Sequence, residues 1–177
     1  GDDVVVVLGC GMLGLTAVAY ALDRGCGTVV ACDLDPARRA LAQEFGATVT
    51  VAPQDLAAAT TRHGADVVLE LSGSSSAVRS AFEVVDLAGR IALVGSVSPA
   101  PQVSFEPSGF VKNLTTVVGS HNYRVDDLVE AVAFLARTPS RRLFADLIPQ
   151  AFGLGEIVDA VATANTGTAP RIAIEFP

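Results

Sequence analysis

The amino-acid sequence predicts an α/β fold in which a doubly wound parallel sheet of about six strands carries helices on both faces. Two observations support this prediction. Short runs of Val, Ile and Leu alternate with segments of helical periodicity, and continuous apolar runs are typical of parallel strands covered on both faces. Residues that favour helix ends also stand between these runs. Successive right-handed βαβ units then build a doubly wound sheet.

The first half of the chain contains five predicted strands, at residues 4–8, 28–32, 47–51, 66–71 and 90–95. Apolar residues between them recur at i, i+3, i+4 and i+7, which predicts amphipathic crossover helices. One helix has Leu15, Val18, Ala19 and Leu22 on its apolar face, and another has Val78, Ala81, Phe82 and Val85. Asp35 and Pro36 predict the start of a further helix, and Gly25 predicts the end of the first.

The second half departs from this rhythm after Gly95. Residues 96–113 are rich in turn formers and lack a helical period, so they are interpreted as a connection into a sixth strand at residues 115–120. Two helical patterns follow, with apolar positions at Leu128, Ala131, Val132 and Leu135 and at Ile157, Ala160, Val161 and Ala164. The alternating residues 171–176 predict a last strand.

Size and charge exclude several classes of protein. A length of 177 residues suits one compact domain, and a net charge of −7 with scattered basic residues argues against a nucleic-acid partner. No apolar run approaches the ~20 residues of a membrane span, and residues 1–7 lack the basic start of a leader peptide. We therefore expect a cytoplasmic protein without membrane contact.

The three cysteines, Cys10, Cys26 and Cys32, are odd in number and lack the spacing of metal ligands. We interpret them as reduced, small apolar residues rather than as a disulfide framework or a zinc site. The sequence accordingly predicts no metal ligand in this chain.

Three glycines, Gly9, Gly11 and Gly14, follow the first predicted strand and open the first predicted helix. A lone G-x-G-x-x-G pattern is weak evidence, but its position between strand and helix favours a dinucleotide-binding loop of the Rossmann type. Gly9 makes the tight turn, Gly11 leaves room for a pyrophosphate, and Gly14 lets the helix pack closely. The amides of Met12 and Leu13 are then the expected phosphate donors, at the positive end of the helix.

An acidic residue, Asp33, ends the second predicted strand about 20 residues after these glycines. Its carboxylate is suited to accept hydrogen bonds from both adenosine ribose hydroxyls and to repel a 2′-phosphate, which favours NAD over NADP. Asp35 is the alternative acid, but its place before Pro36 favours an N-cap role. Arg38 either covers the ribose edge or is a solvated surface charge. A methyltransferase that binds S-adenosylmethionine is less favoured, because a third glycine and a long helix suit a pyrophosphate better.

Along nearly its whole length, the sequence resembles the cofactor-binding half of the medium-chain dehydrogenases and reductases, in their zinc-type alcohol dehydrogenase branch. The segments that carry the resemblance are VVVLGCGMLGLTAVAYALDRG, VVACDLDPARRALAQEFGAT, DVVLELSG, GRIALVGS and the C-terminal tail from DDLVEAVAFL to RIAIEF. The resemblance implies that NAD is the cofactor. It also implies that the backbone around Val94 and Ser96, with Asn122, holds the nicotinamide carboxamide, and that Arg171 reaches the pyrophosphate.

The resemblance further implies an N-terminal catalytic domain that carries the zinc ligands and most of the substrate pocket, and this sequence does not contain it. His63 and His121 are far apart in sequence, and no cysteine has a matching spacing, so zinc is expected only in that missing domain. No catalytic residue is assigned here. His63 is interpreted as a solvated loop residue, His121 as a bystander rather than a catalytic group, and Glu70 as a buried, hydrogen-bonded acid beside the cofactor cleft.

We expect the chain to be the NAD-binding part of an enzyme that transfers a hydride between a small-molecule alcohol or aldehyde and NAD, and to bind the cofactor by itself without turnover. Residues 1–124 form the dinucleotide-binding domain. Residues 125–177 return to the missing catalytic domain, which leaves Ile172, Ile174 and the last helix poorly covered. The family implies a homodimer through the edge strand near residues 115–120. The alternative is a free-standing NAD-binding or redox-sensing module.

Overall fold

The computed structural model of the chain describes residues 1–60, 64–167 and 169–176. Contacts between Cα atoms divide the chain into two compact units, Gly1–Phe134 and Leu135–Pro177. Within the described residues, no helix combines the length and the apolar character that a membrane crossing requires.

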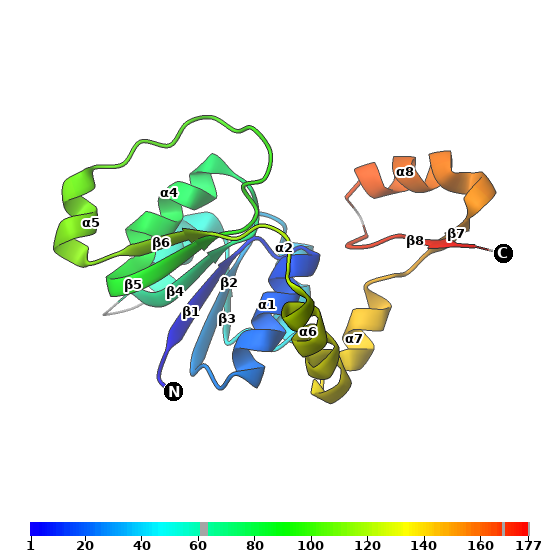
Figure 1. Cartoon of the computed structure of the whole chain (residues 1–177), viewed down its shortest axis with the longest axis horizontal. Coiled ribbons are helices and arrows are strands. Elements are labelled where there is room, and N and C mark those ends of the chain that lie inside the picture. The colour runs from blue at the N-terminus through cyan, green and yellow to red at the C-terminus, as the bar shows by residue number, and fades with distance from the viewer. Residues whose placement is uncertain (61–63, 168, 177) are drawn as a thin grey trace. The chain divides into compact units, whose positions relative to one another are not determined.

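Six parallel strands form the sheet of the first unit, in the order β3-β2-β1-β4-β5-β6 (Figure 1). The strands are β1 (Val4–Leu8), β2 (Thr28–Cys32), β3 (Val49–Val51), β4 (Ala65–Glu70), β5 (Val85–Leu93) and β6 (Thr116–Gly119). The order changes direction beside β1, as in a doubly wound fold, so the predicted fold class is confirmed. Leu8 stands opposite both Cys32 and Glu70, so the carboxyl ends of β1, β2 and β4 lie level at one edge.

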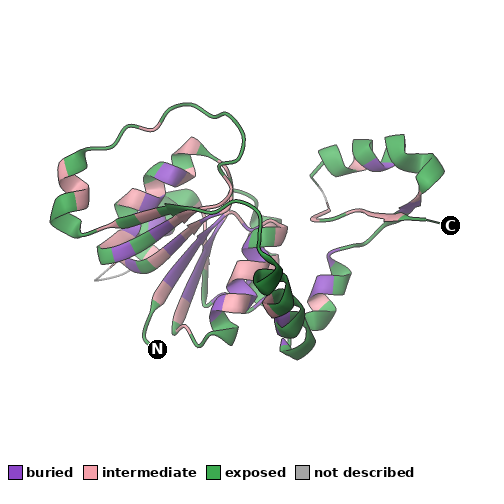
Figure 2. Cartoon of the chain, viewed as in Figure 1, coloured by how far each residue is buried: buried purple, intermediate pink, exposed green. Residues whose placement is uncertain are grey.

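The core of this unit follows the central strands. The last four residues of β1 and of β2 are all buried. Figure 2 shows the buried residues running along the middle of the sheet, while exposed residues dominate the helices at its margin. A strand whose side chains are all apolar is stable only where layers cover both of its faces. The continuous valine runs of the sequence therefore correspond to the centre of the sheet.

Helices pack in pairs against the sheet. α1 (Met12–Asp23) packs with α2 (Pro36–Glu44), and α3 (Leu56–Ala59), which continues a 3₁₀ turn at Pro53–Asp55, packs with α4 (Ser75–Val84). Because right-handed crossovers change direction after β3, the two pairs lie on opposite faces. Asp35 caps α2, as predicted, by accepting a hydrogen bond from the N–H of Ala37 at 2.8 Å.

The remaining helices lie later in the chain. α5 (Pro107–Asn113) precedes β6, and α6 (Val125–Arg137) follows it. The ring of Phe134 in α6 packs edge-on against that of Tyr20 in α1, with centroids 5.3 Å apart. The second unit contains α7 (Arg141–Asp146), β7 (Ala151–Gly153), a 3₁₀ turn at Leu154–Glu156, α8 (Ile157–Asn165) and β8 (Ala173–Glu175). β7 and β8 pair in parallel.

Several details of the predicted elements are wrong. Val85 belongs to β5 and not to the preceding helix, because its backbone is extended and it pairs with Ala65. Residues 96–113 contain α5, whose seven described residues include none that is buried. Such a helix shows no apolar period in the sequence. α7 and β7 were also missed, because six and three residues are too few to show a period.

Candidate functional site

The loop after β1 turns sharply back toward α1. Gly9 has φ +98°, a conformation that favours glycine, and its N–H donates to the carbonyl oxygen of Cys32 at 2.8 Å. A Cβ atom on Gly14 would lie 1.9 Å from the carbonyl oxygen of Gly9. The helix therefore packs against the loop at a separation that only glycine allows.

Gly11, in the same loop, faces open space. A Cβ atom on this residue would meet no atom of the described residues within 4 Å. Gly11 is also the N-cap of α1, where it has no side chain to satisfy the first-turn amides. The amides of Met12 and Leu13, as first-turn groups, have no acceptor within the helix. Room and amide donors thus coincide at the positive end of a helix, which suits a phosphate.

Asp33 follows β2 and is bonded to this loop. Its Oδ2 accepts a hydrogen bond from the N–H of Cys10 (2.7 Å), and its Oδ1 accepts one from the N–H of Asp35 (2.9 Å). The carboxylate therefore joins the glycine loop to the turn that begins α2. A carboxylate oxygen accepts about two hydrogen bonds, so each oxygen of Asp33 keeps an acceptor position for a ligand hydroxyl.

Arg39 supports the same turn and was missed in the sequence analysis. Its Nη1 donates to the carbonyl oxygens of Asp33 (2.8 Å) and Leu34 (2.9 Å). These bonds hold the backbone immediately after β2, while the side chain of Leu34 stays exposed. The sequence shows two adjacent arginines, Arg38 and Arg39, and nothing in their spacing reveals which of them turns back to the strand end.

A cavity of about 390 Å³ opens at this edge of the sheet. Four predicted site residues line it: Gly9, Gly11, Asp33 and Arg38. Four serines of the β4–α4 turn and of α4 also line it: Ser72, Ser74, Ser76 and Ser80. These serines were missed, although the serine-rich stretch directly after the fourth predicted strand was an available signal. Together with lining leucines, they suit a ligand that combines a ring with hydroxyl groups.

Arg38 lies at this cavity and beside Asp35. Its Nε is 3.9 Å from Oδ2 of Asp35, and the side chains are 42% and 50% exposed. An exposed pair of this kind contributes ~0–1 kcal/mol to stability. Its contact with a ribose stays a prediction.

Cys10 and Cys32 are buried near Asp33, and both are free thiols. Burial, followed by the negative charges of Asp33 and Cys32, raises the pKa of Cys10 to about 12. Burial and Asp33 raise the pKa of Cys32 to about 11. Both thiols therefore stay protonated at neutral pH and are poor nucleophiles. They act as small apolar side chains, as predicted.

Val94 and Ser96 follow β5 and are tied to Glu70, at the end of β4. The N–H groups of Val94 and Gly95 donate to the carbonyl oxygen of Glu70 at 2.9 and 2.8 Å, and the hydroxyl of Ser96 donates to its Oε2 at 2.9 Å. Glu70 is fully buried. The prediction of a buried, hydrogen-bonded acid at this position is confirmed.

Asn122 lies in the loop after β6. The N–H of Ser120 donates to the carbonyl oxygen of Leu93 at 3.0 Å, which brings the start of this loop to the end of β5. Asn122 has φ +58°, a left-handed conformation that asparagine tolerates. Asn122 and His121 are both exposed.

Two predicted residues lie outside this group. Arg171 is exposed and belongs to the second unit, and its contact with a pyrophosphate stays a prediction. His63 lies outside the described residues.

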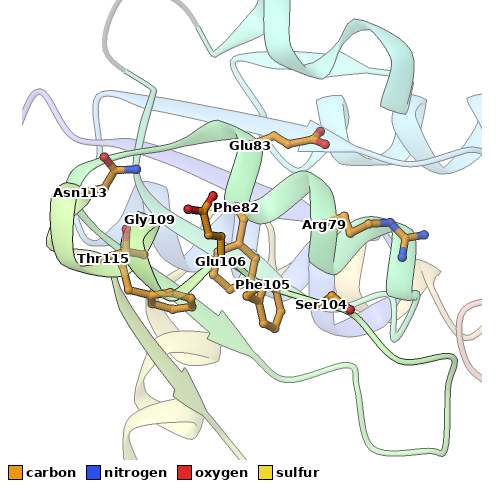
Figure 3. Close-up of a pocket in the computed structure, with 10 residues that line it drawn as sticks. Arg79, Phe82, Glu83, Ser104, Phe105, Glu106, Gly109, Asn113 and Thr115 are labelled. Atoms are coloured by element: carbon orange, nitrogen blue, oxygen red, sulfur yellow. The ribbon is translucent and has the colours of Figure 1, made fainter.

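A second cavity, of about 340 Å³, is lined by residues of α4, α5 and the segment that leads into α5 (Figure 3). The rings of Phe82, Phe105 and Phe110 gather there, with centroids 4.2 to 6.0 Å apart. Figure 3 also shows the side chain of Glu106 beside these rings, and Arg79 lines the same cavity. Among the described residues that line the two cavities, none belongs to both.

Among the described residues, no three His, Cys, Asp or Glu side chains come together as a metal site. A catalytic zinc needs three protein ligands and an open position. The described residues do not by themselves form such a site.

The fold and the first cavity define a class of protein. A sheet in the order 3-2-1-4-5-6, a glycine loop that opens a helix, and an acid after the second strand are the features of a Rossmann dinucleotide-binding domain. Comparison with known proteins narrows this class. The chain belongs to the family of zinc-binding dehydrogenases, whose family model matches residues 13–137. Members of this family use NAD, and the matched domain is their NAD-binding half.

Individual relatives agree with this assignment. The chain is 42% identical over 108 residues to an L-threonine 3-dehydrogenase of Anaeromyxobacter dehalogenans. This match covers 58% of this chain and 31% of that protein. It is 27% identical over 175 residues to the 5-exo-hydroxycamphor dehydrogenase of Pseudomonas putida. This match covers 94% of this chain and 48% of that protein. A solved alcohol dehydrogenase of Thermotoga maritima superposes with a TM-score of 0.92 at 25% identity, over 100% of this chain and 51% of that one. The chain thus spans about half the length of these relatives, or less.

Proposed function

We propose that this chain binds NAD along the carboxyl edge of its sheet. The observation that carries the proposal is that Asp33 and Gly11 line one cavity. An acceptor carboxylate that suits a ribose diol lies there beside an open glycine that suits a pyrophosphate. The residues present therefore fit the cofactor.

The chain's own residues bind and orient the adenosine half. The amides of Met12 and Leu13 donate to the pyrophosphate, since they stand at the open helix start. The two oxygens of Asp33 accept hydrogen bonds from the ribose hydroxyls, and their charge opposes a 2′-phosphate. Arg38 covers the ribose edge from the same cavity.

The loops after β5 and β6 hold the other half. The backbone around Val94 and Ser96, together with Asn122, binds the carboxamide of the nicotinamide. Bound NAD supplies the acceptor for a hydride. The part of these loops is to fix the position of the ring relative to the adenosine half.

We further propose that the chain is one part of a zinc-type alcohol dehydrogenase. Relatives that match it along nearly its whole length are about twice as long, and the described residues do not form a three-ligand zinc site. Residues 1–124 form the dinucleotide-binding part, and residues 125–177 return to the part that supplies zinc and the substrate pocket. The complete enzyme exchanges a hydride between a small-molecule alcohol or aldehyde and NAD, in the cytoplasm. This chain alone binds cofactor without turnover.

Calorimetric titration with NAD and NADP tests the cofactor site. We expect the chain to bind NAD more tightly, and Asp33→Asn to weaken NAD binding about tenfold while it narrows the preference over NADP. Asp126→Asn is the matched control, because Asp126 is exposed in α6 and does not line the cavity. Equal affinity of the unchanged chain for NAD and NADP would contradict the assignment of Asp33.

A homodimer through β6 is part of the same proposal. β6 ends the sheet, and Val118 on it is 48% exposed, so an apolar strand edge is open to pairing with a second copy. Light scattering at micromolar concentration should give a dimer mass, and Val118→Glu should shift it to a monomer. Val49→Glu, in β3 at the other end of the sheet, is the control and should leave the dimer intact. A monomer mass for the unchanged chain counts against the dimer.

A further inference from the structure

We propose that Glu70 is a positioning residue for the nicotinamide end of the cofactor, because its buried carboxyl group sets the spacing between the loop after β4 and the loop after β5. This inference rests on NAD binding as proposed above.

The two carboxyl oxygens of Glu70 bind different loops. Oε1 accepts hydrogen bonds from the N–H and the hydroxyl of Ser72 and from the N–H of Gly73, each at 2.8 Å. Oε2 accepts one from the hydroxyl of Ser96, 26 residues further along the chain, at 2.9 Å. One side chain therefore bridges two loops that leave neighbouring strands.

The backbone of Glu70 makes the same connection. Its carbonyl oxygen accepts hydrogen bonds from the N–H groups of both Val94 and Gly95. Glu70 thus contacts three consecutive residues of the second loop, two through its carbonyl oxygen and one through its side chain. Val94 and Ser96 are the residues expected at the nicotinamide.

Close packing of the loops supports the role independently. A Cβ atom on Gly73 would lie 2.7 Å from the carbonyl oxygen of Gly95, and a Cβ atom on Gly95 would lie 2.5 Å from the backbone nitrogen of Gly73. The loops are in direct contact at glycines on both sides, so they cannot move closer. The bonds to Glu70 oppose their separation, and together these contacts define one spacing.

Complete burial makes these bonds necessary. A polar group removed from water is costly unless its hydrogen bonds are made, and Glu70 is 0% exposed. The three bonds to Oε1 involve only the turn that follows Glu70. The bond from Ser96 is the one that ties the side chain to the loop after β5, so it is the side-chain contribution to positioning, in addition to the backbone bonds from Val94 and Gly95.

The consequence differs between the two ends of the cofactor. Ser72 lines the cavity assigned to the adenosine half, whereas Ser96 belongs to the loop assigned to the nicotinamide. Loss of the Ser96–Glu70 bond should therefore loosen the nicotinamide end and spare the adenosine end. A general loss of stability would weaken both ends together.

The test compares a ligand that has the nicotinamide with one that lacks it. NADH, followed by calorimetry and by the fluorescence of its reduced ring, reports on both ends, and ADP-ribose reports on the adenosine end. We expect Ser96→Ala to raise the Kd of NADH about fivefold, to lower its fluorescence enhancement, and to leave the Kd of ADP-ribose within about twofold. Ser98→Ala, an exposed serine of the same connection, is the control and should change neither.

Variants of Glu70 separate positioning from direct contact. Glu70→Gln keeps an oxygen for Ser72 and Gly73, and its amide can donate to Ser96, whose hydroxyl can accept. It should retain the ratio of the affinity for NADH to the affinity for ADP-ribose that the unchanged chain has. Glu70→Met removes every polar atom of this side chain and should lower the ratio as Ser96→Ala does. Adding Ser96→Ala to Glu70→Met should then have no further effect on the ratio.

Distinct outcomes bear on the two proposals. If the unchanged chain binds neither NADH nor ADP-ribose, the proposed function is wrong and this inference with it. If the unchanged chain binds both and Ser96→Ala leaves the ratio unchanged, only the role of Glu70 is overturned. The same holds if Ser96→Ala has its full effect in the Glu70→Met background, since Ser96 then acts by direct contact. If Glu70→Met does not fold, Ser96→Ala, Ser98→Ala and Glu70→Gln decide the question.

Discussion

The strand β1 and the helix α8 are both rich in apolar residues, but they bury them to very different degrees. Residues 5–8 of β1 are all buried, whereas Ile157, Val158 and Val161 of α8 are 44 to 78% exposed. β1 lies inside a sheet with helices on both faces, so the chain itself completes the core there. An apolar helix face that stays exposed calls for further cover. The difference agrees with the proposal that residues 125–177 pack against another part of a longer enzyme.

The largest expected loss of stability comes from a substitution in the glycine loop, which belongs to the same covered region as β1. Gly14→Ala places a Cβ atom 1.9 Å from the carbonyl oxygen of Gly9, and we expect it to lower the free energy of unfolding by about 3 kcal/mol. Denaturant unfolding followed by circular dichroism measures this loss. The effect should fall on the first unit, since the clash lies between α1 and the loop that follows β1.

Gly11→Ala is the matched change in the same loop. Its Cβ atom meets none of the described residues within 4 Å, so stability should fall by about 1 kcal/mol or less, as expected for alanine in place of glycine at an N-cap. NAD binding should nevertheless weaken, because the methyl group occupies the space proposed for the pyrophosphate. If Gly11→Ala unfolds the chain and Gly14→Ala does not, the structural and binding roles of the two glycines are reversed.

Truncation of one valine in each region compares them directly. Val6 in β1 is 0% exposed and Val158 in α8 is 78% exposed. Val6→Ala should lower the free energy of unfolding by about 2 kcal/mol, from lost burial and the cavity it leaves. Val158→Ala should change it by less than about 0.5 kcal/mol in this chain. Equal losses at the two positions would show that α8 is covered, contrary to the comparison.

The centre of the fold was predictable because its determinants are local in sequence. Continuous valines, glycines at several turns and the N-cap at Asp35 mark the elements in the order that successive right-handed βαβ units require. Asp33 and the three glycines of the loop follow directly from that order. Each lies at the end of a strand or the start of a helix, where the sequence pattern itself defines the position.

The remainder depends on side-chain contacts that no sequence pattern marks. Arg39 turns back to the carbonyl of Asp33, and the hydroxyl of Ser96 reaches Glu70 from the loop after β5. No periodicity marks such bonds, because they depend on how two loops approach in space. α5 and α7 were not predicted for another reason. Helices of seven and six residues with few buried positions leave no apolar pattern in the sequence.

The last expected effect is small and concerns Ala88, in the irregular part of β5. Ala88 has φ +60°, a conformation that costs an L-residue about 1–2 kcal/mol and costs glycine very little. Glycine also loses more conformational entropy on folding, by about 0.4–1 kcal/mol. The two terms oppose each other, so Ala88→Gly should raise the free energy of unfolding by about 0.5 kcal/mol. Ala88→Val is the counterpart and should lower it, because a β-branched side chain fits this conformation least well. Unfolding in denaturant measures both, and a loss of stability in Ala88→Gly would mean that this conformation is held by contacts of the alanine methyl group rather than being strained.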